Sequence, residues 1–291
     1  MRLLILQDHY HLADSLQKQL DVRAESFDVD SQAWQTFNCQ ALEQQHQQKP
    51  FDVILCATLL TVDSSLDLRQ QYTELIKNLT QFAKQKNIPL LFLSTAAVFD
   101  GARIAYQETD QVSPKCDYGR YYVGLEEQVA SCKQHMIIRT GWLYGAASAN
   151  YLTATLSYAI KDELISFNSA GKACPTAIDD VARVLLAIIL QLKYAVENWG
   201  VYHYVASDTA LGFQFIEAIL IQAVKYESGV DAKQLRFEHS NALPDPLFYF
   251  APVVLRCSRL LEDFGIHQRS WRALMPAAVR SYYEDKKKAP I

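Results

Sequence analysis

The sequence predicts an α/β protein with a doubly wound parallel sheet and a smaller lobe toward its C-terminal end. Short, continuous apolar runs recur along the first half of the chain, as in RLLIL at 2–6 and FDVILCA at 51–57. Runs of this length are typical of strands covered on both faces. Amphipathic segments separate them, and this alternation predicts right-handed βαβ units. Half of the 291 residues are apolar, enough for one large core and a smaller lobe.

The elements follow in order. In the first half, strands are predicted at 2–6, 22–29, 51–57, 88–95 and 135–139, and helices at 12–20, 31–48, 66–86 and 118–134. In the second half, helices are predicted at 150–162, 178–192, 212–226 and from about 270, with a strand at 200–206. Residues 1–145, joined by 174–206, are predicted to form a Rossmann-like domain. Residues 146–173 and 207–291 are assigned to a smaller substrate-binding lobe.

Composition narrows the class of protein. The net charge is −4, which argues against a nucleic-acid partner. The longest apolar run, LLAIIL at 185–190, is far shorter than the roughly 20 residues that cross a bilayer. Six cysteines lie far apart without a C-x-x-C pair, so neither a metal site nor a disulfide frame is expected. A cytoplasmic protein without metal is predicted.

The turn after the first strand is unusual for a dinucleotide site. Ligands of such sheets bind outside the carboxyl ends of the strands, and dinucleotide phosphates need glycines in the first turn. Here the turn runs from Gln7 to Ala13 without a glycine, and Tyr10 would fill space near its middle. Asp28 or Asp30, predicted to end the second strand, would suit a ribose hydroxyl if a dinucleotide binds.

A second group of residues points to carbonyl or alcohol redox chemistry. Thr95 ends the predicted strand 88–95, and Tyr118 begins the helix 118–134. That chemistry wants a lysine four residues after the tyrosine, on the same helix face, but Tyr122 stands there. Without a catalytic role, Tyr118 and Tyr122 are expected to be a packed aromatic pair.

Six motifs, in order, resemble the dTDP-4-dehydrorhamnose reductase family of the extended short-chain dehydrogenase/reductase superfamily, over nearly the whole chain. They are STAAVFDG at 94–101, YGRYYVGLE at 118–126, RTGWLYG at 139–145, PTAIDDVA at 175–182, GVYHYVAS at 200–207 and RCSRLLEDFGI at 256–266.

The resemblance implies roles for particular residues. Tyr118 would protonate the carbonyl oxygen of a sugar while the reduced form of NAD or NADP (NADH or NADPH) delivers hydride to the carbon, and Thr95 would hydrogen-bond that oxygen. It also implies two sets of binding residues and a homodimer paired through helices 66–86 and 118–134. The cofactor set is Gln7, Tyr10, Ala13, Asp28 and Asp30, and the substrate set, for a nucleotide sugar such as a dTDP-sugar, is Trp142, Tyr144, Pro175 and Thr176.

The sequence departs from the family where the cofactor and the proton donor act. Tyr122 replaces the lysine, Ala96 replaces an aspartate, and Gln7, Tyr10 and Ala13 stand where the family has glycines. The leading hypothesis is a family member that keeps a nucleotide-sugar pocket but has lost or weakened NAD(P)-dependent reduction. Two alternatives stay open. One is an active reductase or epimerase of a 4-keto-6-deoxy nucleotide sugar. The other is a non-catalytic regulatory subunit, because the β-subunit of mammalian methionine adenosyltransferase is similar to the same reductases.

Overall fold

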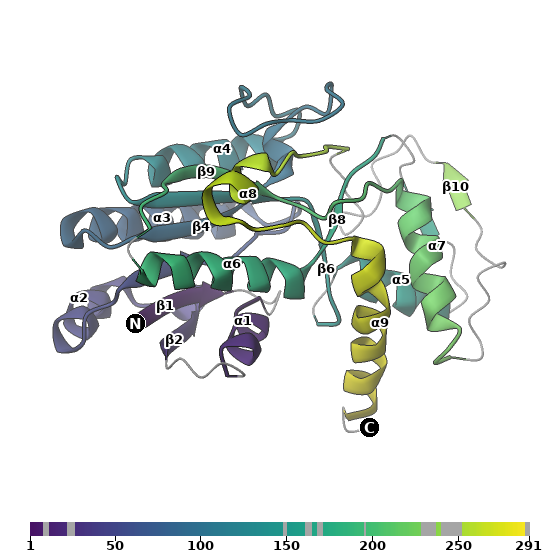
Figure 1. Ribbon diagram of the computed structural model, residues 1–291, viewed down its shortest axis with the longest axis horizontal. Coiled ribbons are helices and arrows are strands. Elements are labelled where there is room, and N and C mark those ends of the chain that lie inside the picture. Colours follow the sequence, from purple (N-terminus) through teal and green to yellow (C-terminus); the bar gives the residue numbers. More distant parts are fainter. Residues whose placement is uncertain are drawn as a thin grey trace.

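A six-stranded parallel sheet forms the centre of the protein, with helices on both of its faces (Figure 1). The computed structural model describes residues 1–7, 12–21, 27–147, 150–160, 165–167, 171–194, 196–227, 237–239 and 252–288. The strand order is β2-β1-β3-β4-β5-β9, and every pair in this sheet is parallel. The predicted doubly wound α/β fold is confirmed.

The inner strands coincide with the apolar runs. They are β1 (Arg2–Gln7), β3 (Val53–Cys56), β4 (Leu90–Thr95) and β5 (His135–Thr140), with β9 (Gly200–Tyr204) at one edge. Side chains such as Leu4, Ile54 and Leu91 are fully buried, because helices cover both faces of the sheet.

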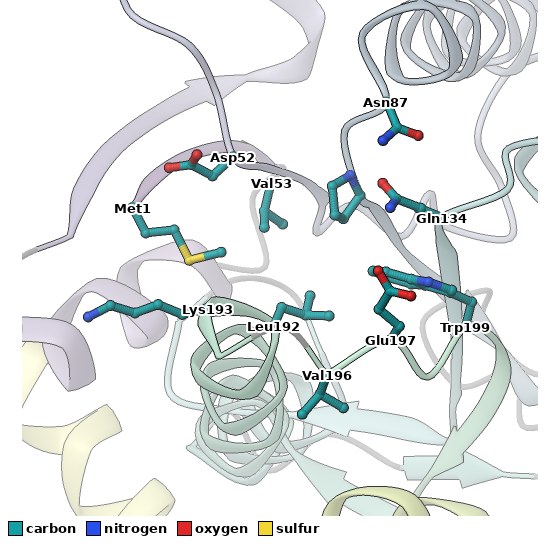
Figure 2. A pocket seen from close by; sticks show the side chains of 11 residues that line it. Met1, Asp52, Val53, Asn87, Gln134, Leu192, Lys193, Val196, Glu197 and Trp199 are labelled. Carbon is teal, nitrogen blue, oxygen red and sulfur yellow. The ribbon is translucent and has the colours of Figure 1, made fainter.

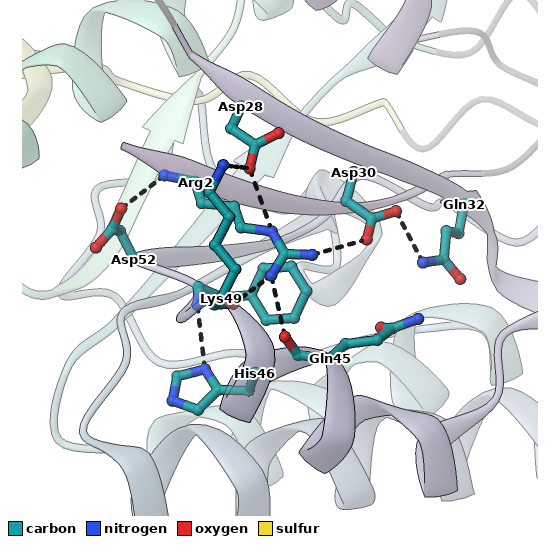
Figure 3. A network of polar contacts seen from close by, with 9 residues as sticks. Arg2, Asp28, Asp30, Gln32, Gln45, His46, Lys49 and Asp52 are labelled. Atoms are coloured by element: carbon teal, nitrogen blue, oxygen red, sulfur yellow. Dashed lines mark hydrogen bonds and ion pairs between the residues drawn. The ribbon is translucent and has the colours of Figure 1, made fainter.

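The second strand lies later in the chain than predicted, because β2 runs from Asp28 to Ala33 and not over 22–29. Asp28 pairs in register with Arg2, so this acid lies at the amino end of the sheet. Figure 3 shows the contacts that both acids make: the Arg2 guanidinium forms ion pairs with Asp28, at 3.4 Å, and Asp30, at 3.5 Å. Lys49 also pairs with Asp28, at 2.7 Å. An edge strand tolerates this polar sequence, which lacks the apolar run that marks the inner strands.

Five long helices flank the sheet. They are α1 (Leu12–Asp21), α2 (Cys39–Gln48), α3 (Leu66–Lys86), α4 (Asp117–Ala130) and α6 (Ile178–Lys193). The predicted helix 31–48 is wrong in its first part, where β2 is followed by a single helical turn, η1 (Trp34–Thr36). Helix α6 packs on α1, where Ser15 Oγ donates to Asp179 Oδ1 at 2.6 Å. Within the described ranges, no helix is long and apolar enough to cross a membrane.

The second lobe has a core of its own, built around Phe215 and Trp271. Its described elements are β6 (Trp142–Tyr144), α5 (Tyr151–Ile160), β7 (Ile165–Phe167), β8 (Pro175–Ala177), α7 (Gly212–Ala223), β10 (Phe237–His239) and α9 (Trp271–Lys288). Helix α8 (Ser258–Phe264) was assigned to this lobe from the sequence, but it packs on β9 and α6. Its Leu260 and Phe264 belong to the main core.

Candidate functional site

Thr95 and Tyr118 lie on two elements that pack against each other. Thr95 ends β4, and its hydroxyl accepts a hydrogen bond from Ala97 N at 3.1 Å, which caps the short helix η2 (Ala96–Val98). Tyr118 lies in the first turn of α4 and is 9% exposed. Gly119 permits α4 to pack against η2, because a Cβ at position 119 would lie 2.0 Å from the carbonyl oxygen of Ala97. The structure therefore brings together the elements that carry the two predicted catalytic residues.

Tyr122 is fully buried one turn further along α4. Its ring centroid lies 4.9 Å from that of Tyr118, as expected for a packed aromatic pair. Its hydroxyl accepts a hydrogen bond from Leu60 N at 2.8 Å. Burial raises the pKa of the Tyr122 phenol well above its ordinary value, so this group stays neutral. A neutral, hydrogen-bonded phenol thus occupies the position at which the chemistry requires a cation.

The sequence reasoning missed Glu126, the next residue along this face of α4. Ser94 Oγ donates to Glu126 Oε1 at 2.5 Å, and Arg139 Nη2 donates to Oε2 at 2.7 Å. Arg139 also lies 3.4 Å from His203 Nε2. Burial, with Arg139 nearby, lowers the pKa of His203 to about 3. The spacing of Tyr118, Tyr122 and Glu126 by four residues was the signal in the sequence. These buried polar groups fix α4 to β4, β5 and β9.

Apolar side chains fill the carboxyl ends of β2 and β3. Trp34, directly after β2, is 4% exposed, and its ring centroid lies 5.0 Å from that of Tyr72. Leu59 and Leu60, after β3, are also buried in the main core. Of the predicted cofactor residues, Gln7 is the last residue of β1, and Ala13 is buried in α1. Tyr10 lies outside the described residues.

Asp28 and Asp30 do not lie at the carboxyl ends of the strands. The carboxyl end of β2 is at Ala33, opposite Gln7, and five residues of strand span about 16 Å. Asp28 therefore lies far from the edge where a ribose would bind, and Asp30 is engaged by Arg2. The expectation that these acids end the strand is wrong. After β2 the chain continues with Trp34, Gln35 and Thr36, which carry no charge.

The predicted substrate residues lie at the junction of the two lobes. Trp142 is partly exposed and stacks on Tyr151, with ring centroids 5.9 Å apart. Tyr144 is fully buried and donates its hydroxyl to Trp271 O at 2.9 Å. Pro175 and Thr176 are buried in β8. Of these four side chains, only Trp142 keeps a surface that a ligand could touch.

A separate cavity of about 430 Å³ lies at the amino end of the sheet, around Asp52, Gln134 and Trp199 (Figure 2). It is at the opposite edge of the sheet from Thr95, so it is not the predicted site. Among the residues that the structure describes, no cluster of three or more His, Cys, Asp or Glu side chains could hold a metal ion.

Comparison with known proteins agrees with this architecture. The family model described as RmlD substrate binding domain matches residues 1–284. A dTDP-4-dehydrorhamnose reductase of Aggregatibacter actinomycetemcomitans is 25% identical over 243 residues, 81% of this chain and 82% of that protein. The corresponding protein of Sinorhizobium fredii is 27% identical over 202 residues, 67% of each chain.

Solved structures show the same fold. The dTDP-4-dehydrorhamnose reductase of Clostridium acetobutylicum superposes with a TM-score of 0.77 at 22% identity, over 99% of this chain and 100% of that one. The reductase of Bacillus anthracis, solved in complex with NADP, gives a TM-score of 0.77 at 19% identity, over 95% and 98% of the two chains. The chain thus belongs to the RmlD substrate binding domain family, within the extended short-chain dehydrogenase/reductase superfamily.

Proposed function

We propose that this protein is a dTDP-4-dehydrorhamnose reductase-like protein that binds a nucleotide sugar but has lost, or greatly weakened, NAD(P)-dependent reduction. The observation that carries the proposal is Tyr122, buried at the position of the family lysine with its hydroxyl bonded to Leu60 N.

The loss of a cation at position 122 has a large chemical effect. An ordinary phenol has a pKa near 10, and a lysine that lowers it by about three units stabilises the phenolate by roughly 4 kcal/mol. Tyr122 cannot supply this stabilisation, because its own hydroxyl is neutral and is bonded to the backbone. Tyr118 is itself nearly buried against the Tyr122 ring, so packing is sufficient to explain why a tyrosine stands at position 118.

The residues near the adenosine end of the site do not fit a dinucleotide either. The Bacillus anthracis protein holds NADP, whose reduced form, NADPH, would supply the hydride in reductions of this class. Its adenosine would lie at the carboxyl ends of β1 and β2, where an acid or an arginine ordinarily binds the ribose. Here Trp34 follows β2 directly, and Asp28 and Asp30 point to Arg2 instead. No step through this cofactor is therefore assigned to the protein.

Nucleotide-sugar binding is the function that this proposal retains. The family motifs of the second lobe are intact, and Trp142 is partly exposed beside Tyr151. The reductases that this chain resembles are named for a dTDP-linked sugar, so a dTDP-sugar is the proposed ligand. All six cysteines are free thiols, which supports the proposed cytoplasmic location.

A turnover assay tests the proposed loss of activity. Purified protein is incubated with dTDP-4-dehydrorhamnose and NADPH or NADH, and consumption of the reduced cofactor is followed. The proposal predicts consumption that is absent or only slightly above the rate without enzyme. Rapid turnover that disappears in Tyr118→Phe would overturn it, because it would show that Tyr118 still acts as an effective proton donor. The Tyr121→Phe variant, three residues further along α4, is the matched control.

A further inference from the structure

The cavity of about 430 Å³ at the amino end of the sheet has no part in the proposed function (Figure 2). Val53, the first residue of β3, lines it and is fully buried. Pro89 and Gln134, which precede β4 and β5, also line it, as does Trp199, which precedes β9. Ligands of parallel α/β sheets ordinarily bind at the opposite edge. A ligand in this cavity would therefore be separate from any ligand near Thr95, at the end of β4.

Hydrogen bonds to main-chain oxygens fix the walls of this cavity. Gln134 O accepts a hydrogen bond from Leu90 N at 2.9 Å, which ties the start of β5 to the start of β4. Trp199 O accepts a hydrogen bond from Arg259 Nη2 at 2.9 Å. The shape of the cavity is therefore set before a ligand arrives, which lowers the entropic cost of binding.

The charged side chains of the lining are mostly acidic. Among the described residues that line the cavity, Asp52 and Glu197 are acids and Lys193 is the one basic side chain. The Lys193 ammonium lies 5.5 Å from the ring centroid of Phe27. Figure 2 shows that the Lys193 side chain extends away from Trp199. The lining thus carries more negative than positive charge, and its cation is turned to another partner.

Two helices end at the cavity and add to its negative potential. Helix α3 ends at Lys86, and the residue that caps it, Asn87, lines the cavity. Helix α6 ends at Lys193, and its last two residues line another wall. The C-terminal end of a helix carries a partial negative charge of roughly half an electron. The cavity therefore favours a cation and disfavours an anion.

Trp199 provides an aromatic surface for such a cation. Its side chain is partly exposed, and no second aromatic ring packs on it within the described ranges. Figure 2 shows Glu197 and Gln134 on the same side of the cavity as Trp199, and Asp52 on the opposite side. An ammonium group is attracted to the face of an indole ring, and it forms a strong hydrogen bond with a carboxylate.

We propose that this cavity binds a linear aliphatic diamine, with one ammonium group at Trp199 and Glu197 and the other at Asp52. Val53 and Leu192 line the same space and match the methylene chain between the two charges. The two positive charges of a diamine match the two acids. The inference does not rest on the proposed function, because the nucleotide sugar would bind at the other edge of the sheet.

Calorimetric titration of the full chain with putrescine, a four-carbon diamine, tests the assignment at physiological ionic strength. The neutral diol of the same chain length, butanediol, is the matched ligand. We expect saturable binding of putrescine by the wild-type protein. Butanediol should bind at least about tenfold more weakly, because hydrogen bonds to charged groups are the stronger ones.

Variants of the two acids locate the binding site. The double variant Asp52→Asn with Glu197→Gln removes both charges, and the new amide at position 52 can still accept the hydrogen bond of Arg2 N. We expect it to bind putrescine about fivefold or more weakly than wild type does. The matched control, Glu217→Gln with Glu284→Gln, removes two exposed acids of the second lobe and should bind as wild type does.

Each result supports or refutes the inference. Trp199→Leu should weaken putrescine binding by about two- to fivefold, and unchanged binding would remove the aromatic contact from the assignment. Equal binding of putrescine and butanediol would refute the role of charge. Equal binding by the double variant and its control would place the diamine elsewhere, and the absence of saturable binding up to millimolar concentration would end the inference. None of these results alters the proposed function. Thermal unfolding verifies that each variant is folded.

Discussion

Tyr122 shows what a single residue can and cannot reveal from sequence. Its position four residues after Tyr118 predicted both the missing cation and the packed aromatic pair, and the pairing is confirmed. Its bond to Leu60 N could not be predicted, because the two residues are 62 positions apart and meet only in the folded sheet. The fold now depends on this tyrosine, because its hydroxyl accepts the hydrogen bond of a buried backbone N–H group.

The Tyr122→Phe variant measures how much the Tyr122 hydroxyl contributes to the free energy of unfolding. Removing the hydroxyl leaves Leu60 N without its acceptor, which should lower the free energy of unfolding by about 1–3 kcal/mol in urea denaturation. Tyr194→Phe, at a 70% exposed tyrosine, should change it by less than about 0.5 kcal/mol. Equal stability of the two variants would show that the hydrogen bond between Leu60 N and the Tyr122 hydroxyl does not stabilise the fold.

His203 gives the protein a predictable loss of stability in acid. Its pKa is about 3 when folded, because burial and Arg139 outweigh the nearby Asp110, against about 6.5 when unfolded. The folded state therefore disfavours the proton, so stability is complete above pH 6.5 and falls as the pH drops toward 3. At pH 4.5 this group alone should cost about 2–3 kcal/mol.

The measurement is the free energy of unfolding against pH. The free energy of unfolding of His203→Gln should fall less steeply than that of wild type between pH 6.5 and 4. That of His267→Gln, at an exposed histidine, should follow wild type. Identical slopes for all three proteins would contradict the assignment of the effect to His203.

At the scale of elements, the inner strands were predicted well and the edge strand was not. Continuous apolar runs identified β1, β3, β4 and β5, since burial on both faces demands them. The sequence of β2 is polar, and Arg2 forms ion pairs with Asp28 at the amino end of the strand and with Asp30 in its middle. The shift moved both acids away from the predicted cofactor edge, so an error in one strand changed the predicted site.

Helix α4 depends on the buried ion pair between Glu126 and Arg139, whose side chains are 7% and 5% exposed. Glu126→Gln leaves the guanidinium charge uncompensated in the core, and we expect a loss of about 3–5 kcal/mol in the free energy of unfolding. The control is Glu74→Gln, in a pair with Lys77 whose side chains are more than half exposed, where the loss should stay below about 1 kcal/mol. Similar small losses in both variants would mean that Glu126 does not anchor the helix.

At the scale of the whole molecule, periodicity was enough to predict the parallel sheet and its helices. The second lobe was harder, because α8 returns to the main core through contacts distant in sequence. The candidate site was predicted in part: the elements of Thr95 and Tyr118 do meet, whereas Tyr144 and Thr176 proved to be buried in the junction. Which residues share an edge depends on strand register, and the sequence alone does not fix it.

A homodimer through α3 and α4 stays a prediction. Gly124 lies on α4, where an added Cβ would meet no atom within 4 Å, so the monomer accommodates a side chain there. Light scattering should give twice the 33.1 kDa chain mass for wild type and for Gly124→Ala, and one chain mass for Gly124→Arg. A monomeric wild type, or a dimeric Gly124→Arg, would place the contact elsewhere or remove it.

The central proposal is that this fold no longer accepts a dinucleotide, because the neutral Tyr122 stands where a cation is required and the buried Trp34 directly follows β2. Calorimetric titration of the purified protein with NADH and with NADPH tests it most directly. The account predicts no saturable binding of either compound up to millimolar concentration. Micromolar binding of NADH or NADPH would contradict it.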